Sequence, residues 1–415
     1  MQDFCIKKLF IIIKRGSSMN ILIFNCGSSS QGFTLFKIGE KRTAEKIIWG
    51  KAKNVAAPSQ VNSWLEWHSN TETFREQEDF PSHRIAAEAI INLLKRLNLY
   101  VDVIGHRFVN GGSFFEKAAE ITPDVDKLLK KCLPLAPIHN PNSYSVIEVC
   151  RKKFPALPQY VVFDTAFHTG RPEFTSVYAI PQEMAEKNNW KKFGFHGLSY
   201  QDVSQKAALL LNKSLSSLKL IMCHLGTGGS SVCALKGGIT FDTSMGYSPM
   251  MGLIMSTRCG DIDGEIILDM IRQGMTADQV SEILNKKSGL IGLSGYSSNL
   301  SEIIDAAENG NSSCQLAFEA YVHRLRGYIG NFIFTLNGVD ALIFTDDLGV
   351  KSWKLRKAVC KESDFSGVLL NEEVNKLADC DKATLISSTK SRIPVWVIPN
   401  DEEKIIVEEM LKIIK

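Results

Sequence analysis

Two glycine- and serine-rich segments have the residue types that bind phosphate. Gly27 to Ser30 ("GSSS") and residues 224–231 ("HLGTGGSS") each follow an apolar run. Glycine lets the backbone approach a ligand, so that N–H groups and hydroxyls can converge on an anion. An ordinary hairpin turn is the rival interpretation of both, and at 27–30 it is at least as good. Neither segment has the GxxxxGK[ST] pattern of a P-loop or a strand–GxGxxG–helix unit.

Two arginines are placed where a guanidinium could hold an oxyanion. Arg107 lies in "GHRFVNGG" and Arg258 in "MSTRCGDIDGE", just before Asp263, which we expect to cap a helix. A lone arginine is usually a surface residue or an ion-pair partner. Two arginines flanked by glycine at strand or loop ends are better candidates for binding a carboxylate or phosphate.

Three histidines, His139, His168 and His196, are flanked by turn residues rather than set on a helical face, and Asp164 ends the apolar run "YVVFD". One such histidine is more often structural, but three with Asp164 favour a site. HxxxH, CxxC and GxSxG patterns are absent from the sequence. Carboxylates beside phosphate loops favour Mg²⁺, with Mn²⁺ as the substitute, held largely by the phosphates.

The elements that must position these residues repeat along the chain. Residues 20–38 and 218–242 both read as strand, Gly-rich loop, strand, about two hundred residues apart. Further strands are expected at 102–109, 159–164, 340–345 and 395–398, with helices over 84–99 and 316–338. The pattern predicts a duplicated α/β fold with the site in the cleft between two domains.

Composition excludes other classes of protein. The 415 residues are 44% hydrophobic and 22% charged, with a net charge of +3, which gives no reason to expect nucleic-acid or membrane partners. Ten scattered cysteines favour reduced thiols in the cytoplasm. The basic segment 1–18 has an apolar core of only Leu9 to Ile13, too short for a secretory signal, and we interpret it as a dispensable extension before Met19. These features indicate a two-domain phosphotransferase acting on a small anion.

Taken together, the motifs resemble the acetate kinase family from Asn20 to nearly the C-terminus. The matching blocks are "NCGSSS", "GHRFVNGG", "LAPIHNP", "FDTAFH", "FGFHG", "CHLGTGG", "DTSMGYSPMMGLIMSTRCGDID", "LNKKSGLIGLSG" and "PNDEE". The resemblance implies two ribonuclease-H-like domains of the actin and sugar-kinase superfamily, 19–165 with 403–415 and 166–402, and a homodimer. It implies reversible phosphoryl transfer to acetate that forms acetyl phosphate, and nothing in the sequence excludes propionate.

The resemblance also implies roles for individual residues. Arg107 and Arg258 would bind the carboxylate and the phosphoryl group, His196 would stabilise the transition state, and Asp164 would assist catalysis or position Mg²⁺. The remaining assignments are a methyl pocket (Val109, Ile138, Phe195, Pro249), a metal–phosphate site (Asn25, Glu402) and a donor-phosphate site (Ser28, Ser30, His224, Gly226, Thr227, Gly228).

The chain departs from the ATP-using pattern on the nucleotide side. Gly32 replaces a lysine, Thr227 an asparagine, and Asn299-Leu300-Ser301 an Asp-x-Arg. The Gly-rich stretch that would lie against adenosine has become Asp346-Asp347-Leu348-Gly349-Val350-Lys351. Larger side chains there would fill the adenosine pocket, and carboxylates are poor neighbours for a polyphosphate.

Several blocks, including "FTDxxG", are similar to the diphosphate-using branch known from amoebae. We therefore expect diphosphate as the phosphoryl donor, with orthophosphate as the acceptor in the reverse reaction. ATP with ADP is the alternative, and a non-catalytic kinase homologue is a second. A rival interpretation of Asp346 and Asp347 is that they cap a helix beginning near Ser352.

Overall fold

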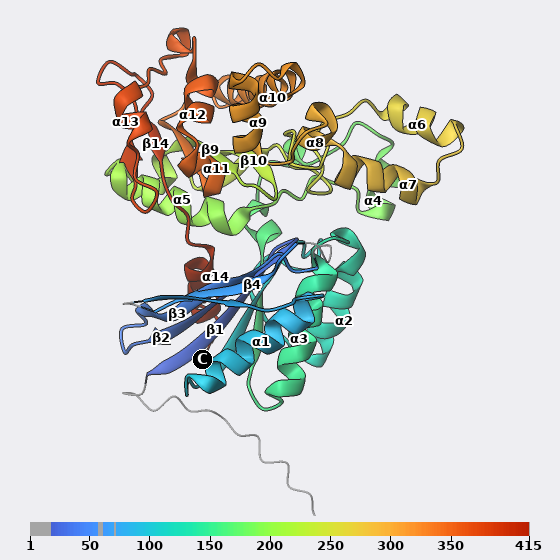
Figure 1. The fold of residues 1–415 in the computed structure, drawn as a ribbon, viewed down its shortest axis with the longest axis vertical. Helices are drawn as coiled ribbons and strands as arrows, with labels where there is room; N and C mark the ends of the chain where they lie inside the picture. Colours follow the sequence, from blue (N-terminus) through green and yellow to red (C-terminus); the bar gives the residue numbers. More distant parts are fainter. Residues whose placement is uncertain (1–17, 57–60, 70–71, 415) are drawn as a thin grey trace, which may run out of the picture.

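The computed structural model of the protein describes residues 18–56, 61–69 and 72–414 and contains two α/β halves, each built on one sheet (Figure 1). Of the expected extension 1–18, residues 1–17 lie outside the described residues. No helix in the described ranges is both long and apolar enough to cross a bilayer.

The first half is an eight-stranded sheet with helices on both faces. Its spatial order is β5 (Thr73–Gln77), β4 (Trp64–His68), β3 (Ala44–Lys53), β2 (Ser30–Ile38), β1 (Met19–Cys26), β6 (Val103–Phe108), β8 (Gln159–Phe163) and β7 (Ala119–Glu120). Its helices are α1 (His83–Arg96), α2 (Pro123–Cys132), α3 (Asn140–Lys153) and α14 (Glu402–Leu411). In β1, Leu22 and Phe24 are buried with α1 and α3, whereas Ile21 and Ile23 are buried with α14. This alternation explains why the strand is apolar throughout.

The second half is a six-stranded sheet. Its order is β11 (Ile239–Thr243), β10 (Ser230–Lys236), β9 (Lys219–Leu225), β12 (Ala341–Thr345), β14 (Val395–Val397) and β13 (Thr384–Leu385). Its helices are α4 (Gln182–Asn188), α5 (Gly197–Leu210), α6 (Gly264–Arg272), α7 (Ala277–Glu282), α8 (Gly289–Ser294), α9 (Leu300–Glu308), α10 (Ser312–Thr335), α11 (Asp346–Lys351), α12 (Trp353–Cys360) and α13 (Glu372–Lys376). In β12, Leu342 and Phe344 join the core around α10, and Ala341 and Ile343 join the core around α5.

The two halves repeat one topology, which confirms the predicted duplication. The order β3-β2-β1-β6-β8 in the first sheet matches β11-β10-β9-β12-β14 in the second. In both, the first two pairings are antiparallel and the last two are parallel. The β1–β2 and β9–β10 loops, which carry the two candidate phosphate segments, are therefore equivalent.

The last helix, α14, crosses from the second sheet and packs on β1, β6 and β8 of the first (Figure 1). Because α14 packs on the first sheet, we propose that residues 19–165 and 403–415 form one domain and residues 166–402 the other.

The rival interpretation of Asp346 and Asp347, as caps of the helix that begins near Ser352, is wrong. A helix does follow Ser352, but Ser352 itself caps α12 by accepting from the Leu355 amide at 3.3 Å. Asp346 and Asp347 instead form the first turn of the separate short helix α11, so they are not caps of α12. Asp263 does cap α6, as predicted, by accepting from the Glu265 amide at 2.9 Å.

Candidate active site

A cavity of about 570 Å³ lies between the two halves, where the central strands of both sheets end. Both glycine- and serine-rich loops line it. It is also lined by most of the predicted site residues: Asn25, Ser28, Ser30, Arg107, Val109, Asp164, Phe195, His196, His224, Thr227, Gly228, Pro249, Arg258, Asp347 and Glu402. The remaining predicted residues, Gly32, Ile138, Gly226, Asn299, Ser301, Leu348 and Gly349, are not part of this lining.

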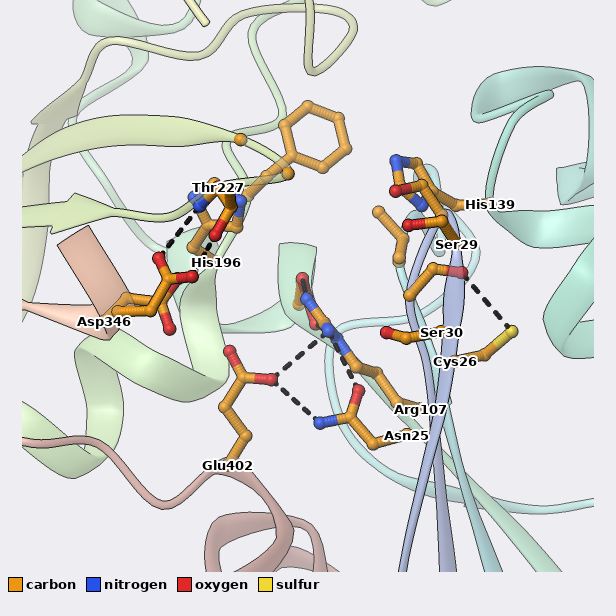
Figure 2. Close-up of a pocket in the computed structure, with 18 of the residues that line it drawn as sticks. Asn25, Cys26, Ser29, Ser30, Arg107, His139, His196, Thr227, Asp346 and Glu402 are labelled. Atoms are coloured by element: carbon orange, nitrogen blue, oxygen red, sulfur yellow. Dashed lines mark hydrogen bonds and ion pairs between the residues drawn. The ribbon is translucent and has the colours of Figure 1, made fainter. Parts of the chain in front are cut away.

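Arg107, near the end of β6, is held by protein acceptors on several sides. Its Nε and Nη2 donate to the two oxygens of Asp164 at 2.7 and 2.6 Å, and its Nη1 donates to Asn25 Oδ1 at 2.9 Å. Glu402 Oε2 lies 3.2 Å from the same Nη1, and Figure 2 shows Glu402 facing both Arg107 and Asn25. Burial opposes the charge, but the Asp164 and Glu402 carboxylates outweigh it and raise the pKa of Arg107. Arg107 therefore fixes the carboxylates of the site in place.

Arg258 is buried without a carboxylate partner among the described residues. Its Nη1 donates to Pro249 O at 3.0 Å, and its Nη2 donates to His139 Nε2 at 3.1 Å. Burial alone lowers the pKa of Arg258 to about 10, so it is still a cation at neutral pH. A buried, uncompensated guanidinium is costly unless an anion joins it. Arg258 is therefore the group in this cavity best prepared to receive one.

The contact with Arg258 also fixes the state of His139. A guanidinium cannot accept a hydrogen bond, so His139 Nε2 must be the acceptor and the ring proton lies on Nδ1. Burial, with the nearby charge of Arg258, lowers the pKa of His139 to about 3. His139 is thus neutral and orients Arg258. By contrast, His168 does not line the cavity, because its two ring nitrogens bond to Thr240 and Phe195 within the second half.

His196 and His224 form a stacked pair on the second-half wall. Their ring centroids are 4.0 Å apart, and His196 Nδ1 lies 2.7 Å from Ser231 Oγ. Burial, followed by the charge of His224, lowers the pKa of His196. A Cβ added at Gly229 would lie 3.6 Å from His196 Nε2 and 3.4 Å from Arg258 Nη1, so glycine keeps the space beside both groups open.

Asp346 is the partner of His224. Its Oδ2 lies 3.2 Å from His224 Nε2, and burial of His224 is outweighed by this carboxylate, which raises the pKa of the imidazole. Asp346 occupies the left-handed region at φ +63°, and a Cβ at Gly226 would meet its Oδ2 at 2.2 Å. Only glycine at 226 allows this close packing. The pair places an imidazole whose protonated form Asp346 favours beside His196, whose protonated form burial disfavours.

Beside Arg258 the cavity has an apolar wall. Val109 and Phe195 are buried with Met245 and Met255 in one small cluster, and both line the cavity together with Pro249. Ile138 precedes the cavity-lining His139 but is not itself in the lining. The site therefore offers a cation and an apolar surface side by side.

The residues expected to alter a nucleotide pocket are only partly at the cavity. Leu348 is 8% exposed and belongs to the core of the second half, so it does not project toward a ligand. Asn299 caps α9 by accepting from the Ser301 amide at 3.0 Å. Of these departures Thr227, Asp346 and Asp347 line the cavity, and the first turn of α11 is what turns Leu348 inward.

Several residues of the site were given no role in the sequence analysis. Lys51 and Lys53 of β3 and Glu403 of α14 line the cavity, and His83 Nε2 bonds to Gly27 O at 3.0 Å and so supports the serine loop. The two lysines had a signal, since residues two apart on a strand share a face. Glu403 also had one, since it follows Glu402 in the matching block "PNDEE". His83 had none, because its partner Gly27 lies far away in the sequence.

The oxygen atoms at the cavity fit a hard cation that is held by few protein ligands and mainly by phosphate oxygens and water. Glu402 and the Asn25 amide supply oxygen atoms at the cavity, and Glu402 Oε1 makes no hydrogen bond or ion pair with a described residue. In the described part of the chain, no cluster of three or more His, Cys, Asp or Glu could hold a metal alone. Mg²⁺ bound by one or two protein oxygens, water and phosphate oxygens matches this arrangement.

Comparison with known proteins gives a consistent result. Residues 20–408 match the sequence profile described as the acetokinase family. The chain is 39% identical over 407 residues to the acetate kinase of Acetivibrio thermocellus, covering 96% of this chain and 100% of that protein. It is similar to the crystal structure of acetate kinase from Entamoeba histolytica (41% identity, TM-score 0.82, 95% and 99% of the two chains). It is also similar to that of a propionate kinase from Francisella tularensis (34% identity, TM-score 0.85, 94% and 98%).

Proposed function

This chain belongs to the acetokinase family, and from that premise we propose that it is an acetate kinase, which transfers a phosphoryl group reversibly between a donor and acetate. The observation that carries this proposal is Arg258, a buried cation without a carboxylate partner among the described residues, next to the apolar wall of Val109, Phe195 and Pro249. A small carboxylate with a short apolar tail satisfies both features.

The side chains match what a loose phosphoryl transition state needs, which is in-line positioning and neutralisation of charge. Arg258 would bind the transferring phosphoryl oxygens. His196 Nδ1, 2.7 Å from Ser231 Oγ, would accept from that hydroxyl, and its Nε2–H would donate to an equatorial oxygen. Arg107 and Asp164 would hold the geometry, and Glu402 with Asn25 would hold Mg²⁺, which when bound neutralises charge on the donor phosphates.

We further propose that diphosphate is the phosphoryl donor and that orthophosphate is the acceptor in the reverse reaction. In its support, the Thr227 amide of the β9–β10 loop donates a hydrogen bond to Asp347. The carboxylates of Asp346 and Asp347 line the part of the cavity beside this loop, which we call the donor end. Gly32, Thr227, Asn299 and Ser301 lack the side chains that the ATP-using pattern has at these positions. Orthophosphate needs only the two loops and the metal, whereas ADP also needs room for a nucleoside beyond Asp347.

Trapping of acetyl phosphate with hydroxylamine tests the activity, with Mg²⁺ and either diphosphate or ATP as donor and either acetate or propionate as acceptor. The reverse reaction, with orthophosphate or ADP, tests the donor pair. We expect acetyl phosphate from acetate and diphosphate. A kcat/KM for ADP well above that for orthophosphate would establish the ATP alternative, and no turnover with any pair would favour a non-catalytic homologue.

We also propose a homodimer, as the family resemblance implies. Phe174, Val177 and Met184 are 72%, 57% and 51% exposed on one short segment, which leaves apolar surface that a second copy could cover. Sedimentation equilibrium of the purified chain tests this, and a monomer at micromolar concentration would contradict it.

A further inference from the structure

Neighbouring residues of β1, β2 and β3 form a row beside the cavity, and this row contains a lysine, Lys51, that has no role in the proposed function. Gly32 pairs with Asn25 on one side and with Lys51 on the other, and Ser30 pairs with Lys53. Directly opposed residues of antiparallel strands share a face, so Lys51 and Lys53 stand on the face that carries Asn25 and the end of the serine loop. Both lysines line the cavity.

The two lysines differ in how their charges are used. Lys53 Nζ lies 3.3 Å from Glu66 Oε1 and 5.8 Å from the centroid of the Trp64 ring. Lys51 is exposed and forms no ion pair with a described residue. Burial raises the pKa of Asp346 on the opposite wall, but His224 and, to a smaller extent, the charge of Lys51 outweigh it and lower that pKa. Lys51 is therefore an uncommitted cation that faces the donor end of the cavity.

The residue between Lys51 and Asn25 explains why the lysine can reach inward. Gly32 has no side chain, and an added Cβ there would lie 3.2 Å from Asn25 O and 3.5 Å from Glu403 Oε1. The glycine leaves a gap in the row that the flexible stem of Lys51 can cross. Position 32 is also where the resemblance to ATP-using kinases leads us to expect a lysine.

We infer that Lys51 binds the outer phosphate of the donor, supplying from the neighbouring strand the positive charge that a lysine at position 32 would supply. The naming of inorganic diphosphate as the ligand rests on the proposed function, whereas the binding of a donor phosphate by Lys51 does not. Lys53 stands beside this phosphate and is partly neutralised by Glu66. A cation on the first half also balances Asp346 and Asp347 on the second, so that a polyanion is accepted between them.

Replacing Lys51 by Met tests the inference. We expect the KM for diphosphate and for orthophosphate to rise about tenfold, as for the loss of one charge-assisted contact, while kcat and the KM for acetate change less than about twofold. Calorimetric titration with inorganic diphosphate and Mg²⁺ should show the same loss of affinity without turnover. Lys37→Met is the matched control, because Lys37 is an exposed lysine near the other end of β2 and should leave all constants unchanged.

The double variant G32K/K51M separates a donor contact from a general effect of charge. If Lys51 replaces a cation at position 32, restoring a lysine there should recover most of the lost diphosphate affinity. A double variant as weak as Lys51→Met, or a Lys51→Met protein with unchanged affinity, would overturn the inference.

The two proposals fail in different ways. If the wild type uses ADP and not orthophosphate, the diphosphate proposal fails, and the KM for ADP in Lys51→Met then decides the role of Lys51. An unchanged KM for ADP would reject that role, and a raised one would retain it. Thermal unfolding of each variant checks that the substitutions, of which Gly32→Lys is at a buried position, have left the fold intact.

Discussion

The carboxylate of Asp347 accepts hydrogen bonds from both the backbone amide and the hydroxyl of Thr227, the former at 2.9 Å. Both positions depart from the ATP-using pattern, and the structure makes them partners. Ser256, two residues before Arg258, donates in turn to the Thr227 carbonyl. The β9–β10 loop is therefore bonded on one side to α11 and on the other to the segment that carries Arg258.

Replacing Asp347 by Gly should release this loop and widen the donor end of the cavity. We expect kcat/KM for ADP to rise by about tenfold at most and to stay below that for orthophosphate, because Gly32, Asn299 and Ser301 still lack polar contacts for a nucleotide. Steady-state assays with both acceptors measure the ratio. Asp347→Asn is the control that keeps the size and removes the charge. A preference for ADP in Asp347→Gly would show that this one side chain sets donor choice.

Replacing Arg258 by Ala should lower kcat/KM by about 10²–10³, because it removes a fixed charge from the developing phosphoryl oxygens. Arg258→Lys should recover only part, since an ammonium lacks the planar fork that contacts Pro249 O and His139 together. Arg107→Ala should be equally inactive and also less stable, because it leaves Asp164 buried without its bidentate partner. Near-normal activity in Arg258→Ala would contradict the placement of the site.

Stability should fall as the pH falls below about 6.5. Burial lowers the pKa of His106 to about 4 and of His168 to about 3, so neither binds a proton in the native protein at pH 5. In the unfolded chain both bind protons below about 6.5, and each such histidine lowers the unfolding free energy by about 1.4 kcal/mol per pH unit. Urea unfolding from pH 7.5 to 5 measures this loss.

His106→Gln supplies the comparison for that measurement. A glutamine can still donate to Gln159 Oε1, which lies 2.9 Å from His106 Nε2, but it does not titrate. The slope of the unfolding free energy against pH should therefore be smaller in this variant by up to about 1.4 kcal/mol per pH unit, which corresponds to one proton. A wild-type stability that is flat between pH 6.5 and 5 would contradict the assignment of neutral, buried imidazoles.

Arg356 should be a stability residue rather than a catalytic one. It is 1% exposed and donates to Gly349 O at 2.9 Å, Val350 O at 2.6 Å, and the side-chain and backbone oxygens of Asn375 at 2.7 Å each. Removing it leaves these buried acceptors without donors, so Arg356→Met should cost about 2–4 kcal/mol in urea unfolding. Arg392→Met, at a more exposed arginine, should cost much less. Equal losses in the two variants would refute this explanation.

The sequence by itself determined the kinds of elements and most of the chemical groups. Alternating apolar residues in runs such as 20–26, followed by glycines and hydroxyls, are local signals, and the same signals at 218–231 were enough to predict the duplicated fold. Arg107 and Asp164 could be named because each stands at the end of such a run, and strand ends of parallel pairs meet at one edge of a sheet. His196 and Arg258 stand in turn segments beside glycine, and their roles came from the family resemblance.

Only the tertiary structure decided which of these groups face one another. The contacts of Asp347 with Thr227 and of Arg107 with Glu402 join residues that lie on different elements far apart in the chain. The turn of α11 sends Leu348 into the core, although the sequence suggested a place in the ligand pocket. The pairing of Lys51 with Gly32 depends on strand register, and register is fixed by burial on both faces of the sheet rather than by any local preference.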